Sequence, residues 1–221
     1  MYFDPRQVGM KPPPFKHTVY NALVIPRPIG WISTVSAAGE VNLAPYSFFN
    51  SLSANPPCVM YCPNYHKFGM DEHKDSLLNA EETKEFVYNM CTAELGEQMI
   101  ITSKSSPRSF SEMKEAGLEA VPCEQVKPPR IKASPIAMEC RYLQTVDLPD
   151  PGDGTRSAMV IGEVVGIHID DSIISNGLIN MAKLRPLARL GYYDYAVIEA
   201  AHLFSMQTPD DPRFADEEGT G

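Results

Sequence analysis

The sequence has little positive charge: 19 Lys and Arg residues stand against 28 Asp and Glu residues, which gives a formal net charge of −9 at pH 7. A nucleic-acid surface needs clustered Lys and Arg to neutralise phosphates, and no such cluster occurs. No apolar run reaches membrane-spanning length, and residues 1–17, MYFDPRQVGMKPPPFKH, form no basic, hydrophobic leader. We therefore expect a soluble, cytoplasmic protein that binds neither nucleic acid nor membrane.

The sequence also lacks a complete set of metal ligands. Its cysteines are scattered and odd in number: Cys58, Cys62, Cys91, Cys123 and Cys140. This disfavours a disulfide framework and favours a reducing compartment. Cys58 and Cys62 have a CxxxC spacing, but no second cysteine pair or close histidine completes a tetrahedral zinc site. His66 and His73 are seven residues apart in a predicted loop, and no HExxH occurs, so no bound metal is expected.

No GxGxxG motif occurs, which excludes dinucleotide binding in the Rossmann manner. A chain of 221 residues can form one large β domain or two small ones, and we expect one. Residues 121–135 contain four prolines and no sustained periodicity. They are predicted to cross irregularly from one part of the fold to another, and not to link two separate cores.

Short strands with inserted helices follow one another along the chain. Strands are predicted at residues 31–35, 41–44, 58–61, 85–91, 137–146, 157–169 and 195–200, and Val24 and Ile25 are predicted to enter the sheet. Helices are predicted within residues 15–23 and at 75–84, 94–102, 109–116 and 176–182. A turn at 37–39 and a loop at 150–155 join strand pairs. Without regular βαβ alternation, this order favours an antiparallel β-barrel.

The most informative stretch is residues 26–57, PRPIGWISTVSAAGEVNLAPYSFFNSLSANPP. Pro45 donates no backbone hydrogen bond and therefore belongs at a strand end or bulge, where freed amides can face a ligand. Hydroxyls of Ser33, Thr34 and Ser47 occur close to aromatic side chains in this stretch. Such a combination suits a heteroaromatic ring that carries a phosphate.

The aromatic residues of the same stretch have a simpler interpretation. Adjacent strand residues face opposite ways, so at least one of Phe48 and Phe49 is expected to pack in the core. Trp31 is expected in the core as well.

Lys74, Asp75 and Ser76 place a cation just before a predicted helix, whose N-terminal amides can bind a phosphate. Spacing alone allows a second interpretation, in which Asp75 or Ser76 caps the helix and Lys74 is solvated.

Together these segments resemble the flavin reductase-like family of FMN-binding split barrels, whose hallmark is RPIGWIST, a short turn, NLAPYSFFN and PP. Three later segments resemble that family in the expected order: residues 73–89 (HKDSLLNAEETKEFVYN), 135–148 (PIAMECRYLQTVDL) and 185–195 (RPLARLGYYDY). The resemblance spans nearly the whole chain. It implies a mainly β, antiparallel Greek-key split barrel with inserted helices, one domain over residues 1–221, with a core at about 18–200 and extended termini.

The resemblance also implies a set of FMN-binding residues. Those near the phosphate and ribityl chain are Ser33, Thr34, Lys74, Asp75 and Ser76, where Ser76 replaces the commoner threonine. Those along the isoalloxazine ring, read mainly through the backbone, are Asn42, Ala44, Pro45 and Ser47. Arg189, Gly191 and Tyr195 are candidates to close the pocket, although Arg189 can equally be a salt-bridged structural arginine and Tyr195 a barrel plug. Arg27 and Arg189 are equal candidates for a cation near flavin N1.

By the same resemblance, the protein is expected to be an FMN oxidoreductase in which NADH or NADPH gives a hydride to flavin N5 and the electrons pass to an acceptor. No catalytic side chain is expected, because the flavin carries the chemistry. Two alternatives stay open: a flavoredoxin-type electron carrier reduced by a partner protein, and a non-catalytic split barrel with another ligand. Relatives imply a homodimer with FMN near the subunit interface.

Overall fold

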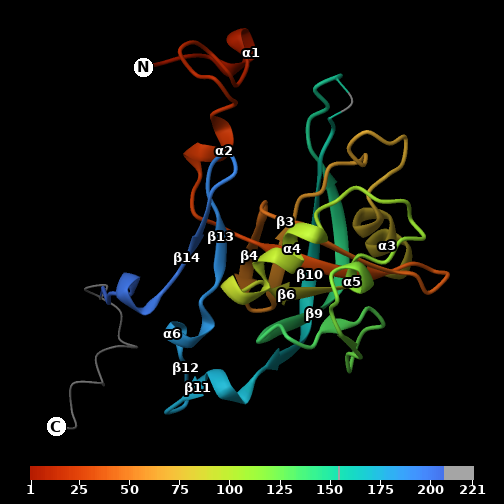
Figure 1. The fold of residues 1–221 in the computed structure, drawn as a ribbon. Coiled ribbons are helices and arrows are strands. Elements are labelled where there is room, and N and C mark those ends of the chain that lie inside the picture. Colours follow the sequence, from red (N-terminus) through yellow and green to blue (C-terminus); the bar gives the residue numbers. More distant parts are fainter. Residues whose placement is uncertain (154, 207–221) are drawn as a thin grey trace.

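The computed structural model describes residues 1–153 and 155–206 and is dominated by one seven-stranded antiparallel sheet with the order β3-β2-β6-β9-β10-β5-β4 (Figure 1). Its strands are β2 (Gly30–Val35), β3 (Val41–Tyr46), β4 (Phe49–Ala54), β5 (Pro57–Tyr61), β6 (Glu85–Met90), β9 (Ile136–Asp147) and β10 (Ala158–Ile169). The mainly β, antiparallel fold class is therefore confirmed.

Within the described part of the chain, three smaller antiparallel sheets accompany this one. The strands of the three-stranded sheet are β1 (Arg27–Pro28), β13 (Leu187–Arg189) and β14 (Tyr195–Val197). Two further ladders pair β7 (Ala120–Val121) with β8 (Arg130–Ile131), and β11 (Ile174–Ser175) with β12 (Leu178–Ile179).

The helices are short. The α-helices are α1 (Pro5–Val8), α2 (Tyr20–Leu23), α3 (Asp75–Thr83), α4 (Gly96–Ile101), α5 (Glu112–Glu115) and α6 (Met181–Leu184). Single 3₁₀ turns are η1 (Ala93–Leu95), η2 (Asp171–Ile173) and η3 (Ala200–His202). None of these described helices is long and apolar enough to span a membrane.

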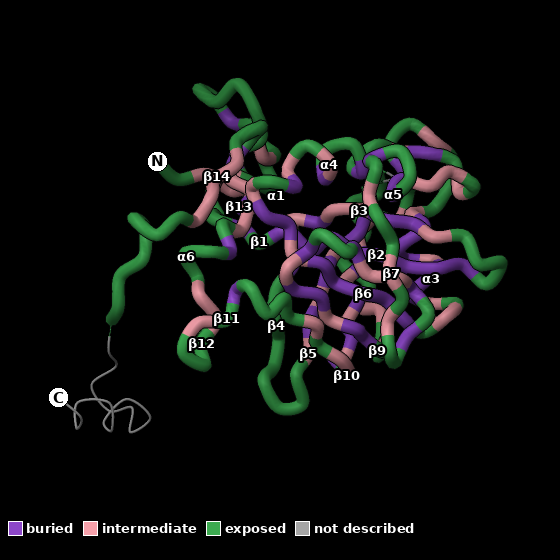
Figure 2. The backbone as a smooth tube through the Cα atoms, turned by 60° about the horizontal axis from the view of Figure 1, so that its bottom comes forward, coloured by how far each residue is buried: buried purple, intermediate pink, exposed green. Residues whose placement is uncertain are grey.

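Strand β2 is covered on both faces, and all six of its residues are buried (Figure 2). Its side chains alternate between two apolar clusters, as the twofold period of a strand requires. Ile32 packs with Leu77 of α3 in one cluster, whereas Trp31 packs with Met99 of α4 in the other. This double cover fixes the position of the β2–β3 hairpin relative to α3 and α4.

The structure confirms the predicted β2–β3 hairpin, with Pro45 near the end of the edge strand β3 and opposite Trp31. Trp31 is fully buried, and of the adjacent pair Phe49 is buried while Phe48 is exposed. The two long strands around the 150–155 loop are also confirmed, as β9 and β10; residue 154 of that loop lies outside the described residues.

Several boundaries were predicted wrongly. Val24 and Ile25 are exposed and precede β1, because the sheet begins only at Arg27. The helix predicted at 176–182 is largely a hairpin: Asn176 and Gly177 have positive φ angles of 52° and 76° and form its turn. The predicted helix at 109–116 contracts to α5.

The capping prediction for α3 is also wrong. Lys74 is the N-cap residue and makes no side-chain capping hydrogen bond. Asp75 instead pairs with Lys67, and the Ser76 hydroxyl bonds to the hydroxyl of Tyr46. Both side chains therefore bond to tertiary partners and do not cap the helix.

The N-terminal segment and the three-stranded sheet form an arm beside the main sheet, drawn in red and blue in Figure 1. Arg27 connects the N-terminal segment to the three-stranded sheet, because its guanidinium donates to the carbonyls of Val24 (2.7 Å) and Leu190 (2.9 Å). Gly191 packs directly against Ala22, at a spacing that leaves no room for a Cβ atom.

Candidate functional site

A cleft lies between the edge strand β3, the loop before α3 and the segment that follows α4. We call it the β3 cleft; it encloses about 380 Å³ of empty space, part of which is open to solvent. Its lining residues are Asn42, Ala44, Pro45, Tyr46, Lys67, Lys74, Asp75, Thr102, Ser103, Lys104, Ser105, Ser106 and Glu112. Residues predicted from two separate motifs, NLAPYS and KDS, therefore meet in one place.

The wall formed by β3 has backbone groups that no neighbouring strand uses. Strand β3 is at the edge of the sheet and, among the described strands, pairs only with β2. Pro45 removes one donor from this edge, which is where proline is tolerated in a sheet. Five predicted residues line the cleft, and three of them come from β3: Asn42, Ala44 and Pro45.

The floor of the cleft contains a buried ion pair. Lys67 Nζ lies 2.8 Å from Asp75 Oδ2 and 2.9 Å from Glu72 Oε2. Burial acts to lower the pKa of Lys67, but its hydrogen bonds to Asp75 and Glu72 outweigh burial and raise that pKa above its usual value. The second oxygen, Asp75 Oδ1, is buried and has no hydrogen-bond partner among the described residues.

Lys74 lies beside this pair and makes no ion pair with any described residue. Burial lowers its pKa, and the charge of Lys67 lowers it further. Glu112 also lines the cleft, and burial raises the pKa of its carboxyl, which accepts a weak hydrogen bond from the Leu43 amide at 3.4 Å. An anion that approached Lys74 would relieve the repulsion between the two lysines.

The segment Thr102–Ser106, TSKSS, forms the third wall and was not predicted from the sequence. Trp31 Nε1 donates to Thr102 Oγ1 at 2.8 Å, and this hydroxyl donates to the Met99 carbonyl at 2.8 Å. The Phe68 amide donates to Ser105 Oγ at 3.2 Å. Ser106 Oγ is buried without a partner among the described residues. A run of hydroxyls around a lysine just after a helix was the available sequence signal.

Ser33 and Thr34 do not line the cleft and are fully buried. Ser33 Oγ donates to the Pro129 carbonyl at 2.6 Å and accepts from Asn89 Nδ2 at 3.2 Å. Thr34 Oγ1 accepts from the Asn42 and Asn79 side-chain amides at 3.3 Å and 3.0 Å. In this arrangement both hydroxyls stabilise the fold around β2, and their role toward a cofactor stays a prediction.

The other predicted residues reach the cleft indirectly or not at all. Ser76 is buried behind Tyr46, which does line the cleft. Ser47 follows β3 and is half-buried outside the cleft.

Arg189 is in the three-stranded sheet, with its guanidinium 4.5 Å from the Tyr195 ring centre and bonded to the Tyr192 carbonyl. The structure therefore does not bring Arg189 or Arg27 to the β3 cleft.

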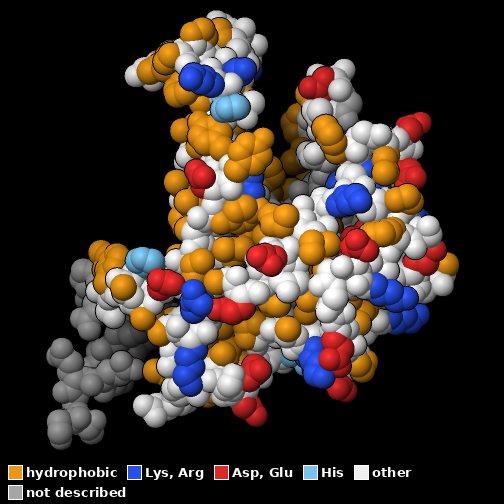
Figure 3. Space-filling view, viewed as in Figure 1, with side chains coloured by type: hydrophobic (Ala, Val, Ile, Leu, Met, Phe, Trp, Pro, Cys, Tyr) orange, Lys and Arg blue, Asp and Glu red, His pale blue; other side chains and the backbone are white. Residues whose placement is uncertain are grey.

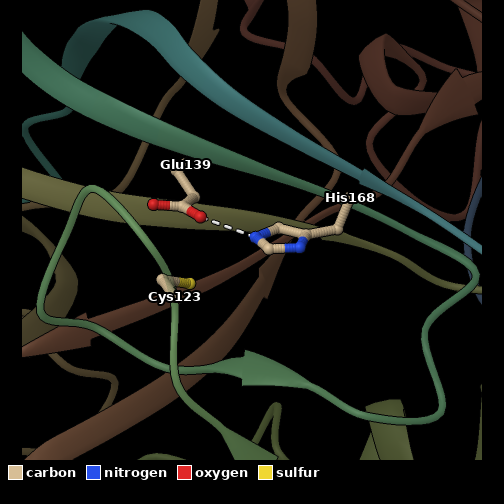
Figure 4. Close-up of side chains that lie close together, drawn as sticks. All are labelled: Cys123, Glu139 and His168. Carbon is tan, nitrogen blue, oxygen red and sulfur yellow. Dashed lines mark hydrogen bonds and ion pairs between the residues drawn. The ribbon is translucent and has the colours of Figure 1, made fainter.

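One cluster of potential metal ligands occurs elsewhere among the described residues: Cys123, Glu139 and His168, whose ligand atoms lie within 4.8 Å of one another (Figure 4). Glu139 already accepts three backbone N–H bonds, from residues 124–126 at 2.6–3.1 Å, and one His168 bond at 2.5 Å. These bonds account for the burial of the carboxylate and attach the irregular segment after β7 to β9.

A mainly antiparallel split barrel with a polar, lysine-lined cleft defines a class of ligand-binding β-barrels. The model of the Flavin reductase like domain matches residues 22–194. An uncharacterized protein of Aquifex aeolicus (strain VF5) is 39% identical over 176 residues, which cover 77% of this chain and 85% of that protein. The chain therefore belongs to the flavin reductase-like family, which binds flavin.

Two solved structures support the same assignment. Nitrilotriacetate monooxygenase component B from Bacillus cereus is 27% identical, with a TM-score of 0.82 over 93% of this chain and 98% of that one. A 2-nitrobenzoate 2-nitroreductase from Pseudomonas fluorescens is 26% identical, with a TM-score of 0.74 over 87% and 89% of the two chains.

The β3 cleft fits a flavin nucleotide by its donor set. It contains lysines for a phosphate and hydroxyls for a polyol chain, and its edge strand leaves backbone groups for ring heteroatoms. Asp75 and Ser106, which line it, each have a buried polar atom without a partner among the described residues: Asp75 Oδ1 and Ser106 Oγ. Buried polar atoms are rarely left unpaired in native proteins, so a ligand that bonds to them suits this cleft.

Proposed function

We propose that this protein is a cytoplasmic FMN-dependent oxidoreductase that is reduced by NADH or NADPH. The observation that carries the proposal is the β3 cleft, in which the NLAPYS strand and the KDS turn meet beside Lys74 and Lys104, neither of which has a carboxylate partner among the described residues. Its membership of the flavin reductase-like family supports flavin as the ligand. The five free cysteines are consistent with a reducing compartment.

The residues divide by chemistry along the cleft. Lys74 and Lys104 supply cationic donors for the FMN phosphate, in the manner of charge-assisted hydrogen bonds. The β3 edge at Asn42, Ala44 and Pro45 faces the isoalloxazine ring, whose heteroatoms can bond to backbone groups. When bound, FMN supplies the redox chemistry, accepting a hydride from the nicotinamide and passing electrons to an acceptor. The protein binds the flavin and limits access of water to it.

The direct test is the visible spectrum of the purified protein loaded with FMN, followed by anaerobic addition of NADH and of NADPH. We expect stoichiometric bound FMN and loss of its absorbance with at least one nicotinamide. Bound FMN that stays oxidised with both would contradict the reductase function while leaving flavin binding intact. No specific FMN binding would contradict the proposal as a whole and favour a split barrel with another ligand.

An electron carrier of the flavoredoxin type is the second candidate function. In that case a partner protein, and not a nicotinamide, would reduce the bound flavin. The similarity to nitrilotriacetate monooxygenase component B is consistent with either function. Anaerobic rates with nicotinamide and with a redox partner separate the two candidates.

We also propose a homodimer with FMN near the interface. Large apolar side chains are exposed along the arm (Figure 3): Tyr20, Leu23, Val24, Ile25 and Tyr193 are all at least half exposed. Apolar surface of this kind favours association. In sedimentation velocity we expect a dimer for the wild type and a shift toward monomer for Leu23→Asp. Leu143→Asp, at an exposed apolar position on β9 outside the arm, is the control.

A further inference from the structure

Cys123, Glu139 and His168 bring a sulfur, an oxygen and a nitrogen together from three segments of the chain (Figure 4). Glu139 belongs to β9 and His168 to β10, whereas Cys123 lies in the irregular segment between β7 and β8. The three ligand atoms all lie within 4.8 Å of one another. Ligand atoms around a zinc ion lie about 2.0–2.3 Å from the metal, so one ion can reach all three after small side-chain movements.

The pairing of β9 with β10 places two of these side chains on one face of the sheet. Gly166 is the partner of Glu139, and His168 follows Gly166 by two residues. Residues two apart on a strand face the same way, so His168 projects beside Glu139. A Cβ at Gly166 would lie 3.2 Å from the carboxyl carbon of Glu139. The glycine therefore leaves room for the Glu139 side chain to lie across β10.

The Glu139 carboxylate is oriented by the same segment that contains Cys123. It accepts hydrogen bonds from the three backbone amides of residues 124–126 at 2.6–3.1 Å. Hydrogen bonds of this kind hold ligating carboxylates in place in metal sites. They also fix the distance between the Cys123 segment and β9, so the site is assembled before any ion arrives.

The contact that an ion would replace is the one between Glu139 Oε1 and His168 Nε2, which are 2.5 Å apart. Two ligand atoms of a tetrahedral zinc ion are about 3.3 Å apart, so the imidazole would have to move outward by less than about 1 Å. The His168 side chain is 23% exposed, whereas that of Glu139 is 1% exposed. His168 can therefore make this movement, and its exposed edge is a path by which an ion can enter.

We propose that Cys123, Glu139 and His168 bind a zinc-class divalent cation. A thiolate with an imidazole and one carboxylate suits Zn²⁺, whereas Mg²⁺ and Ca²⁺ prefer oxygen ligands alone. Three protein ligands leave the fourth tetrahedral position to a water molecule. On binding, the thiol proton of Cys123 and the proton shared by Glu139 and His168 pass to solvent. None of the three residues lines the β3 cleft, so the proposal does not depend on flavin binding.

A bound ion would attach the segment after β7 to both long strands at once. The hydrogen bonds of Glu139 already attach it to β9, and the ion adds a bond to β10 through His168. The same contacts also suit a metal-free ion pair between Glu139 and His168. That interpretation gives the Cys123 sulfur no role, so the sulfur is the atom that the experiment has to report on.

The experiment adds Co²⁺ to the full-length protein, freed of metal with a chelator and kept reduced. Difference spectra against the same protein without Co²⁺ cancel the absorbance of any other group. We expect a sulfur-to-cobalt charge-transfer band that saturates at one ion per chain and is removed by Zn²⁺, which binds more tightly. Zn²⁺ should also raise the melting temperature of the wild type, because it binds the folded state.

Cys123→Ala should remove the band and weaken Zn²⁺ binding by more than about a hundredfold, since loss of a partner one shell further out already costs about tenfold to a hundredfold. His168→Gln should weaken Zn²⁺ similarly, while its amide can still donate to Glu139 and retain the fold. Cys62→Ala is the matched control, because Cys62 is also a half-buried free cysteine but is not in the cluster. It should leave the band and the Zn²⁺ affinity unchanged.

Two results would overturn the proposal. One is a wild type that gives no charge-transfer band with Co²⁺ and no rise in melting temperature with Zn²⁺, which would leave Glu139 and His168 as a metal-free ion pair. The other is a band that persists in Cys123→Ala, which would place the ion on a different cysteine. Neither result bears on FMN binding, which the visible spectrum of the FMN-loaded protein tests separately.

Discussion

Lys67 and Asp75 form an ion pair of 2.8 Å in which both side chains are nearly inaccessible, with 3% and 6% of their surfaces exposed. The pair joins the loop before α3 to the first residue of that helix. It also explains why Asp75 does not cap the helix, and it leaves Asp75 Oδ1 without a hydrogen-bond partner among the described residues. A structural interaction thus sets the orientation of a residue in the candidate site.

Replacing Lys67 by Met should lower the free energy of unfolding by about 3–5 kcal/mol, because the Asp75 carboxylate would then be buried without its partner. Urea unfolding at pH 7 measures the change. The pKa of Lys67 is raised, so the contribution of the pair is complete below the ordinary lysine pKa of 10.5 and is lost only as pH rises through the higher folded-state value. Lys132→Met is the control: that lysine and its partner Glu119 are 60% and 62% exposed, and we expect a loss below about 1 kcal/mol.

Glu139→Gln should make stability less dependent on acid pH. Burial acts to raise the pKa of Glu139, but the amides of Glu124 and Gln125, with His168, outweigh it and hold that pKa below its usual value of 4.5. The carboxylate therefore stabilises the fold above pH 4.5, and this stabilisation is lost as pH falls through the lower folded-state pKa. The free energy of unfolding, measured in urea between pH 7 and pH 3, should fall less steeply with pH in the variant. At pH 7 the variant should start from a free energy of unfolding about 2 kcal/mol lower than wild type. An unchanged slope would show that Glu139 is not linked to folding; Glu119→Gln on the surface provides that baseline.

The sequence was most predictive where structure is local. The β2–β3 hairpin and the long strands β9 and β10 follow from alternation and turn residues within a few positions of one another. The edge position of Pro45 follows from its missing donor. The NLAPYS and KDS motifs likewise predicted two walls of the cleft.

What the sequence could not supply depends on distant packing. Ser33 and Thr34 have the residue types of a binding strand, but β2 is covered on both faces, and strand periodicity alone does not reveal the second cover. The segment Thr102–Ser106 reaches the cleft because Trp31, 71 residues away, anchors it. Arg189 lies in a separate sheet whose position is set by the arm.

Gly162→Ala should destabilise the barrel by about 1–3 kcal/mol, because a Cβ at this position would overlap the Phe86 ring and lie 3.1 Å from the Arg141 carbonyl oxygen. Phe86 is fully buried and has no room to move. Gly96→Ala is the matched substitution: its Cβ would meet only Leu187 at 3.5 Å at the start of α4, and a gain of about 0.5 kcal/mol is expected. Thermal or urea unfolding of both variants tests the pair, and equal losses would contradict this account of the packing.

Lys74→Ala should separate the phosphate of FMN from the rest of the flavin. If Lys74 meets the phosphate, the variant loses a charge-assisted hydrogen bond worth about 1.5–3 kcal/mol, and FMN binding weakens about tenfold to a hundredfold. Riboflavin, which has no phosphate, should bind the variant within about threefold of wild type on the same scale. Lys114→Ala controls for net charge, since Lys114 is exposed on α5 and does not line the cleft. Equal weakening of FMN and riboflavin by Lys74→Ala would contradict a role of Lys74 in binding the phosphate. Lys104 would then be the remaining candidate, because it also lines the cleft and has no carboxylate partner among the described residues.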